Sequence, residues 1–227
     1  ECKKAGADAV KFQMWRASDL YTKKHPLWNF IKKSEVTFDK AKKINDYCDK
    51  IGIEFFCSAF YPEAVTFLET LGVKRYKVAS RTCLMKDPYA IETLKEKAST
   101  RKPIVVSMGM GGDVDAITKI FRKNKNILFC YCISQYPLDI IKMNWEQAVQ
   151  YDGLSDHTMG ILTPILFCAL KKERGSKKIF IEKHVKLQES NGPDASTSID
   201  IGELKELVSK IRIIEKLHLP IIKNPLN

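Results

Sequence analysis

Short β-rich runs recur along the chain at a nearly regular spacing, and this recurrence limits the fold more than any other feature. After a long first gap the runs start roughly 22 to 28 residues apart, the length of one strand with its helix and loops. The sequence therefore predicts an α/β protein made of repeated βα units. The predicted strands are residues 9–14, 53–60, 75–80, 103–109, 127–134, 153–157 and 179–185.

Helical patterns fill the intervals between these strands. Apolar residues recur every three or four positions in residues 38–51, so they share one face of a helix. Pro62 is typical of a first helical turn, Gly72 of the position after a last turn, and Asp113 of a helix cap. The sequence thus predicts helices at residues 38–51, 62–71, 114–122, 160–170 and 201–217.

Seven parallel strands with crossover helices fit either a (β/α)8 barrel or a doubly wound sheet. A dinucleotide-binding wound sheet needs a G-x-G-x-x-G turn, and the only similar stretch, SMGMGGDV, has Val114 at the third glycine position. The fingerprint therefore fails. The opening residues, ECKKAGADAV, are typical of a helix end that turns at Gly6 into a strand. If the fold is a barrel, we expect this chain to lack strand one and most of helix one.

Composition narrows the class of protein. The net charge of +11 comes mostly from scattered Lys, without the Arg and aromatic clusters of sequence-specific nucleic-acid binders. We therefore expect no nucleic-acid partner, and a field that attracts anionic small substrates. No leader or membrane-length apolar run is present, and the seven cysteines form no C-x-x-C pair. A cytoplasmic protein of one domain, residues 1–227, is expected.

Polar side chains gather at the C-terminal end of every predicted strand. Side chains alternate between the faces of a strand, so Ser155 and His157 share a face, as do Glu182 and His184. A single serine there is typical of a loop start, but the same pattern on seven strands indicates an active site at one rim. The other polar positions near strand ends are Lys11, Gln13, Ser58, Lys77, Ser107, Ser134 and Tyr136.

Lys11 and Lys77 lie inside the apolar stretches AVKFQM and RYKVAS. Burial of an ammonium group destabilises the folded protein by about several kcal/mol unless an anion lies beside it. Together with the nearby hydroxyls, the two lysines predict a pocket for phosphate or carboxylate.

His157 and His184 end consecutive predicted strands, so a barrel would place them side by side. Two neutral imidazoles form a candidate site for a divalent metal, with water or substrate oxygens as further ligands. Zn²⁺ would need a third protein ligand, for which Glu182 is a candidate, whereas Mn²⁺ or Mg²⁺ would not. The alternative is a loop histidine and a hydrogen-bonded core histidine.

Eight motifs, in order and at matching spacing, resemble the sialic acid synthase family, which includes N-acetylneuraminate, pseudaminic acid and legionaminic acid synthases. The motifs are AGADAVKFQ, IGIEFFCSAF, GVKRYKVAS, SMGM, YPLD, LSDHTMGI, IEKHV and NGPD. The resemblance implies a (β/α)8 barrel that condenses phosphoenolpyruvate with an N-acetylated hexosamine, such as N-acetylmannosamine, and releases phosphate. It also implies a divalent cofactor, Mn²⁺ first with Mg²⁺ or Co²⁺ as alternatives, and a homodimer of the full-length protein.

The resemblance also implies roles for residues that match the family's motifs. Catalysis falls to Lys11, Gln13, His157 and His184, of which the two histidines bind the metal. The residues that resemble the phosphoenolpyruvate site are Lys11, Lys77, Ser80, Ser107, Ser134 and Ser155. Those that resemble sugar contacts are Gln13, Ser58, Tyr136 and Asp194.

Several positions depart from the family pattern. The family's first-strand Glu and its small antifreeze-like domain have no counterpart in these residues, CSAF replaces the usual STPF, and Ala195 replaces a His. Two other functions therefore stay open at this point. One is another phosphoenolpyruvate-dependent aldol-type synthase, and the other is a non-catalytic barrel remnant that binds anions.

Overall fold

The computed structural model describes residues 1–124, 126–190 and 192–218, in two compact units. The N-terminal unit is Asp8–Leu128. The C-terminal unit combines Glu1–Ala7 with the described residues from Phe129 onward. The prediction of one domain stays a prediction.

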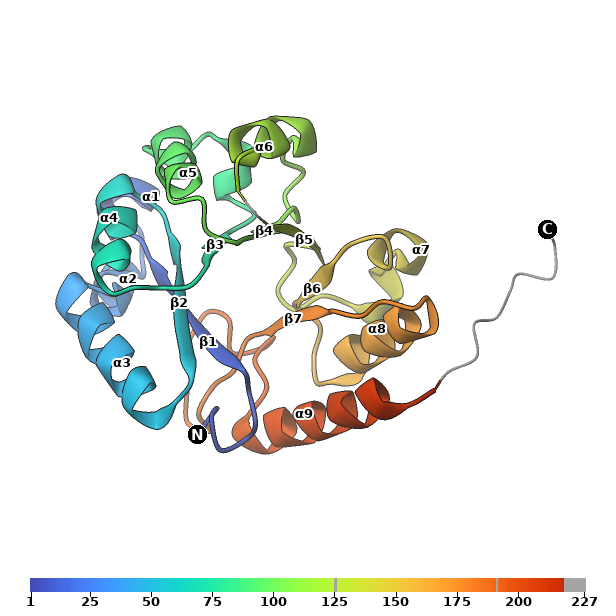
Figure 1. Ribbon diagram of the computed structural model, residues 1–227. Helices are drawn as coiled ribbons and strands as arrows, with labels where there is room; N and C mark the ends of the chain where they lie inside the picture. The colour runs from blue at the N-terminus through green and yellow to red at the C-terminus, as the bar shows by residue number, and fades with distance from the viewer. Residues whose placement is uncertain (125, 191, 219–227) are drawn as a thin grey trace. The chain divides into compact units, whose positions relative to one another are not determined.

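The N-terminal unit is built on four parallel strands (Figure 1). They are β1 (Ala9–Met14), β2 (Glu54–Ala59), β3 (Tyr76–Val78) and β4 (Ile104–Ser107). β2, β3 and β4 are buried along almost their whole length, as expected for parallel strands that are covered on both faces.

Helices connect these strands and cover the sheet. They are α1 (Ala17–Leu20), α2 (Trp28–Ser34), α3 (Phe38–Ile51), α4 (Pro62–Thr70), the 3₁₀ helix η1 (Thr82–Leu84), α5 (Ala90–Ser99) and α6 (Val114–Phe121). The Thr37 and Asp113 side chains cap α3 and α6 by accepting backbone N–H bonds. Tyr76 of β3 points towards α4, where its hydroxyl donates to Glu69 Oε1 at 2.5 Å.

The C-terminal unit contains three parallel strands, β5 (Ile127–Cys132), β6 (Gly153–Asp156) and β7 (Phe180–Lys183). The unit boundary falls inside β5, whose pairing with β6 runs from Cys130 to Cys132. The helices are the 3₁₀ helix η2 (Ile140–Lys142), α7 (Trp145–Ala148), α8 (Leu162–Glu173) and α9 (Ile201–Lys216).

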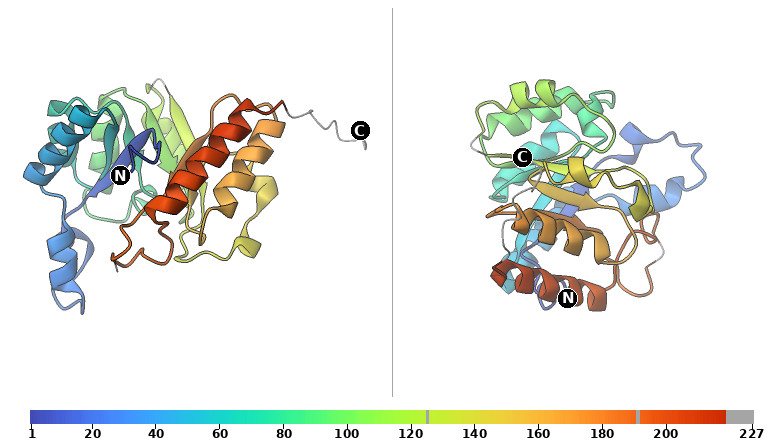
Figure 2. Two further views of the ribbon diagram at one scale, coloured as in Figure 1. Left: turned by 90° about the horizontal axis from the view of Figure 1, so that it is seen from below. Right: turned by 90° about the vertical axis from the view of Figure 1, so that its right-hand side faces the viewer.

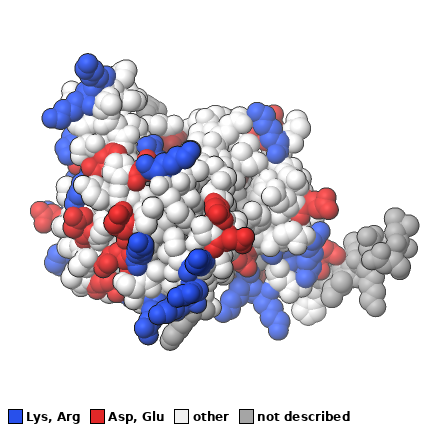
Figure 3. Space-filling view, turned by 90° about the horizontal axis from the view of Figure 1, so that it is seen from above, with Lys and Arg blue, Asp and Glu red and all other residues white. Residues whose placement is uncertain are grey.

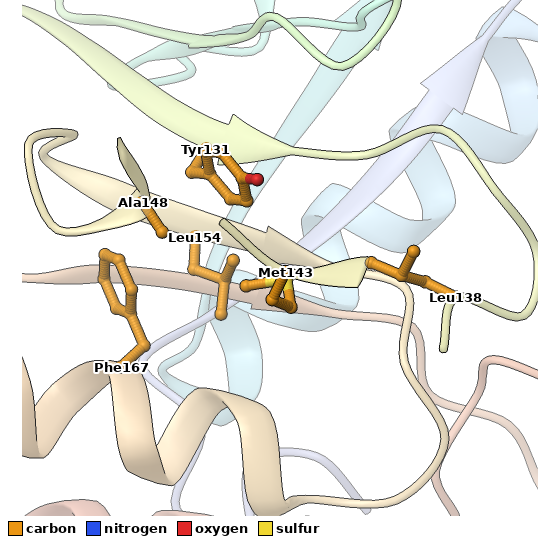
Figure 4. Packing of buried hydrophobic residues seen from close by; sticks show 6 residues of the cluster. All are labelled: Tyr131, Leu138, Met143, Ala148, Leu154 and Phe167. Carbon is orange, nitrogen blue, oxygen red and sulfur yellow. The ribbon is translucent and has the colours of Figure 1, made fainter. Parts of the chain in front are cut away.

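An apolar cluster between strand β6 and helix α8 forms one core of this unit. Leu154 of β6 and Phe167 of α8 face each other across it, and Tyr131 closes one side (Figure 4). All six central residues are buried. Strand β6 fits closely at its first residue, because a side chain on Gly153 would meet Phe180 and Cys130.

Helix α9 lies alongside α8 (Figure 2). Its first turn carries a capping box: Asp200 accepts from the Glu203 N–H, and the Glu203 side chain accepts from the Asp200 N–H. Leu204 and Leu207 of α9 pack with Ile199 and Ala5, which ties the start of the chain to this unit.

The predicted strands and the five predicted helices are confirmed, with ends displaced by a few residues. The starts of helices α3, α4, α6 and α9 agree with the sequence patterns, whereas α8 begins at Leu162 instead of residue 160. Gly160 itself has a φ of 65°, which excludes it from the helix.

Bulk features also agree with the sequence. No disulfide joins any of the seven cysteines, all of which lie among the described residues. Among the described residues, no helix is both long and apolar enough to cross a bilayer. On the face drawn in Figure 3, basic and acidic side chains are interspersed, as the scattered lysines of the sequence predict.

Candidate functional site

The polar strand-end residues of the N-terminal unit form a row across neighbouring strands. Strand register pairs Gln13 with Ser58, Ser58 with Lys77, and Lys77 with Val105. Paired residues on parallel strands point to the same face, so Gln13, Ser58 and Lys77 share one side of the sheet. Lys11 lies on this face two residues before Gln13, which confirms the predicted alternation of side chains.

Lys77 is held inside the unit by a serine of the next strand. Its side chain is 2% exposed, and its Nζ donates to the Ser107 hydroxyl at 2.6 Å. Ser80, just beyond β3, is also buried, and its hydroxyl accepts from the Gly109 N–H at 3.0 Å. Three residues of the predicted anion site are therefore buried near the ends of β3 and β4.

The other N-terminal candidates differ in burial. Lys11 and Gln13 are half-buried, so the expectation of two buried lysines holds for Lys77 alone. The hydroxyl of Ser58 is buried and has no hydrogen-bond partner within the described part of the chain. Cys57 points to the opposite face and packs without exposure, which raises the pKa of its thiol to about 12.

A second buried lysine, Lys97 of α5, was not predicted. Its Nζ donates to the Ala59 carbonyl at 2.8 Å and to the Lys77 carbonyl at 3.0 Å, at the ends of β2 and β3. Complete burial lowers its pKa to about 7. The signal in the sequence was its spacing, because positions 90, 94 and 97 form the buried face of the helix.

A second row of polar residues lies in the C-terminal unit. Register pairs Cys132 with Ser155 and Ser155 with Glu182, and the Ser155 hydroxyl donates to Glu182 Oε1 at 2.8 Å. His157 and His184 follow two residues later on the same face. Their ring centroids are 5.5 Å apart, so the structure brings the predicted histidine pair together.

His157 is fixed by its Nδ1 atom, which lies 2.8 Å from the Ile133 carbonyl oxygen. Because a carbonyl oxygen only accepts, this contact assigns the proton to Nδ1 and leaves the lone pair of neutral imidazole on Nε2. Burial lowers the pKa of His157, but the contacts with Cys132 and Ile133 outweigh burial and raise it above its usual value. A ring held in this way is suited to bind a metal through Nε2.

Two further predicted residues surround the histidine pair. The Tyr136 ring lies 4.1 Å from the ring of His157 and 6.1 Å from that of His184, centroid to centroid. Asp194 Oδ2 lies 3.8 Å from His184 Nδ1. The loop that carries Asp194 returns to β7 because Ile199 N donates to the His184 carbonyl. Ser134 is half-buried just beyond β5, and Asn191 of the NGPD motif lies outside the described residues.

The donor set limits which metals fit. Among the described residues, no group of three or more His, Cys, Asp or Glu side chains could hold a metal ion. Two imidazoles alone do not satisfy structural zinc, but they suit a cation whose other ligands are water or substrate oxygens. His157 and His184 are therefore the residues that could hold such an ion.

Asp156 is explained by its neighbour on β7. It points away from the histidine face, where its Oδ2 accepts from Lys183 Nζ at 2.7 Å, with both side chains buried. The pattern that predicts this pair was present in the sequence, since opposite charges stand at paired positions of β6 and β7.

Comparison with known proteins agrees with this arrangement. The sequence pattern of the NeuB family matches residues 1–221, nearly the whole chain. The chain belongs to the NeuB family.

Several relatives of the chain are named synthases. The chain is 30% identical to N,N'-diacetyllegionaminic acid synthase of Legionella pneumophila, over 94% of this chain and 65% of that protein. It is 32% identical to pseudaminic acid synthase of Campylobacter jejuni, over 94% of this chain and 66% of that protein. The chain thus spans about two thirds of the length of these relatives.

A solved structure shows the same fold. N-acetylneuraminic acid (sialic acid) synthetase from Leptospira borgpetersenii, in complex with citrate, matches all of this chain with a TM-score of 0.82 and 26% identity. The match covers 78% of that chain. The predicted α/β class and the resemblance to sialic acid synthases are confirmed.

Proposed function

We propose that this NeuB-family chain catalyses a sialic-acid-type synthase reaction. Phosphoenolpyruvate would condense with an N-acetylated hexosamine, such as N-acetylmannosamine, to give a nonulosonic acid and inorganic phosphate. The carrying observation is the His157–His184 pair, in which the Ile133 carbonyl fixes the His157 ring and leaves Nε2 for a metal. Family membership and the synthase names of the relatives support the reaction class.

The charged end of phosphoenolpyruvate would bind to the lysine–serine groups. The hydrogen bond to Ser107 already holds the Lys77 ammonium group in one position, so little side-chain entropy is lost when an anion binds. Lys11, on the same sheet face, supplies a second ammonium group. Two cations match an anion that carries both a phosphate and a carboxylate. We assign Ser80, Ser134 and Ser155 to hydrogen bonds with its oxygens.

The sugar would bind to the residues around the histidine pair. Tyr136 presents a ring beside both imidazoles, and Asp194 is an exposed carboxylate that can accept from sugar hydroxyls. We assign Gln13 and Ser58 to the same substrate. A divalent cation on His157 and His184, Mn²⁺ first with Mg²⁺ or Co²⁺ as alternatives, would polarise the aldehyde oxygen of the open-chain sugar.

The bond changes in this proposal balance. The C2=C3 π electrons of phosphoenolpyruvate form a bond from C3 to the aldehyde carbon, and the aldehyde C=O π pair moves to its oxygen, which takes a proton and becomes a hydroxyl. Water adds at the electron-poor C2 and loses its protons, the C2–O bond to phosphate breaks, and C2 is left as a ketone. The residues of the chain would position the two substrates and stabilise the charge that develops in the transition state, and both effects lower the activation barrier.

We further propose that the seven strands are seven of the eight strands of a (β/α)8 barrel. The match of the whole chain to sialic acid synthetase supports this assignment. A cytoplasmic homodimer is our proposal for the full-length protein.

The test is phosphate release by the full-length protein from phosphoenolpyruvate. Release should require both Mn²⁺ and an N-acetylated sugar. The panel is N-acetylmannosamine, its 6-phosphate, a diacetamido sugar and a phosphosugar that lacks an N-acetyl group. The His184→Ala variant should fall to the background rate, while His218→Ala, which removes an exposed histidine near the end of α9, should keep wild-type rates. Turnover that persists with a chelator would remove the metal role. Turnover only with phosphosugars that lack an N-acetyl group would favour another aldol-type synthase. Binding of phosphoenolpyruvate without turnover would favour a non-catalytic protein.

A further inference from the structure

We propose that the buried ion pair between Asp156 and Lys183 positions His157 and His184 for metal binding. This inference rests on the proposed metal role of the two histidines. It adds positioning residues on the opposite face of the same strands, away from the metal and the substrates.

The pair sits directly behind the histidines. Asp156 and Lys183 are register partners on β6 and β7, and each immediately precedes one of the histidines. Their side chains are 0% and 2% exposed, respectively, and Lys183 Nζ lies 2.7 Å from Asp156 Oδ2. Because successive side chains point to opposite faces, a bond that fixes these two residues also fixes the direction of the next two.

The network continues past His157. Thr158 N donates to Asp156 Oδ1 at 3.0 Å, and the Thr158 hydroxyl lies 3.1 Å from Asp156 Oδ2. Lys183 Nζ also donates to the Thr158 carbonyl. Asp156 and Thr158, the residues on either side of His157, are therefore both bonded to Lys183, the residue before His184.

Helix α8 is tied to the same network. The hydroxyls of Thr158 and Thr163 are 2.9 Å apart, so Thr158 donates to the carboxylate and accepts from Thr163 in the first turn of α8. All of the polar side chains in this network are buried, which leaves no water to replace a lost bond cheaply. The backbone around His157 is thus anchored on both sides of the ring.

Stability alone does not account for an ion pair at this place. Buried ion pairs often stabilise a fold no better than apolar residues of similar volume, because both charges lose their hydration. What an apolar pair cannot supply is the bond from Lys183 to the Thr158 carbonyl. The placement of the network beside the two candidate ligands, together with its reach over both strands and α8, points to a positioning role.

The experiment measures Mn²⁺ binding to the full-length protein by the electron paramagnetic resonance signal of free Mn²⁺, with unfolding by denaturant in parallel. Asp156→Asn and Lys183→Met should each weaken Mn²⁺ binding about 10- to 100-fold, the effect usual for groups that orient metal ligands. The double variant Asp156→Leu/Lys183→Met should regain stability, since it removes both charges, but not affinity.

A matched control breaks an ion pair elsewhere. Arg75 donates to both carboxylate oxygens of Glu54, at 2.6 and 2.9 Å, in the N-terminal unit. Glu54→Gln should lower stability and leave Mn²⁺ affinity unchanged. Equal Mn²⁺ affinity in the wild type and the double variant would overturn the positioning role.

The two proposals fail in different ways. Wild-type protein that binds no Mn²⁺, or binds it equally after His157→Ala, overturns the metal site and the positioning role with it. Binding that depends on His157 but not on the Asp156–Lys183 pair overturns the positioning role alone.

Discussion

At the scale of single residues, alternation along strands predicted which side chains share a face, and the structure confirms it for both rows. Lys77 meets Ser107, and His157 meets His184, as their positions on consecutive strands predicted. Alternation could not predict the tautomer of His157, which depends on a backbone carbonyl at residue 133. That contact arises where the chain leaves β5, and no side-chain pattern records it.

Lys97 shows a second limit of the sequence. When a lysine stands on the inner face of a helix, its ammonium group usually still reaches water, because the helix rotates slightly or the long side chain extends to the surface. Here the stem lies inside the unit, and the Nζ atom meets two strand-end carbonyls. Which of these outcomes occurs depends on the distance between α5 and the sheet, a tertiary quantity.

The burial of Lys97 predicts a pH dependence of stability. Its pKa is about 7 in the folded protein, below the ordinary value of 10.5, so between these values the unfolded chain binds one more proton. Stability should therefore rise with pH in this window, by up to about 1.4 kcal/mol per pH unit. The neutral amine still has two N–H donors, which preserves both carbonyl contacts.

Urea unfolding of the wild type and of Lys97→Met, at pH 7.5 and 8.5, tests this effect. The free energy of unfolding of the wild type should increase relative to that of the variant by about 1 kcal/mol over this step. Comparing the two proteins cancels the titration of all other groups. A difference that stays constant with pH would show that Lys97 keeps its charge when buried.

At the scale of elements, the sequence predicted the existence of strands better than their ends. The β5 run was expected to reach residue 134, but the strand ends at Cys132, and the following turn carries Tyr136 against the histidine rings. Ile133, an apolar β-branched residue, directly follows the last paired residue, so composition alone does not mark the end of the strand. The short helices α1, α2 and α7 were not predicted, since four to seven residues are too few to show a period. Helix α5, with ten residues, was also missed.

The fit of β6 between its neighbours predicts a strong effect at Gly153. A methyl group there would overlap the Phe180 carbonyl oxygen and lie 2.8 Å from Phe180 Cβ and 3.0 Å from Cys130 Sγ. Gly153→Ala must push β6 away from β5 and β7, and should lower the free energy of unfolding by about 3 kcal/mol. Denaturant unfolding measures the change.

Gly192→Ala is the matched control, because nothing lies within 4 Å of the added atom. Its stability should stay within about 0.5 kcal/mol of the wild type. If Gly153→Ala were equally harmless, the strands would have room that the structure does not give them.

At the scale of the whole molecule, the buried lysine–serine group and the histidine pair fall into different compact units. The lysine–serine group of Lys77, Ser80 and Ser107 belongs to the N-terminal unit, and the His157–His184 pair to the C-terminal unit. The sequence predicted both groups from the recurrence of strands with polar ends. It could not predict a division of the chain at Leu128, because that division depends on which elements pack together.

This division predicts that two ligands protect different amides from hydrogen exchange. Mn²⁺ alone should slow exchange in β6 and β7, and inorganic phosphate alone should slow exchange around β3 and β4, because each ligand stabilises the conformations it binds. At 100 times the dissociation constant the protection amounts to about 2.7 kcal/mol. His184→Ala should abolish the Mn²⁺ effect and spare the phosphate effect. If Mn²⁺ still protected β1–β4 in the His184→Ala variant, the metal would bind away from the histidine pair. The metal chemistry assigned to His157 and His184 would then be wrong.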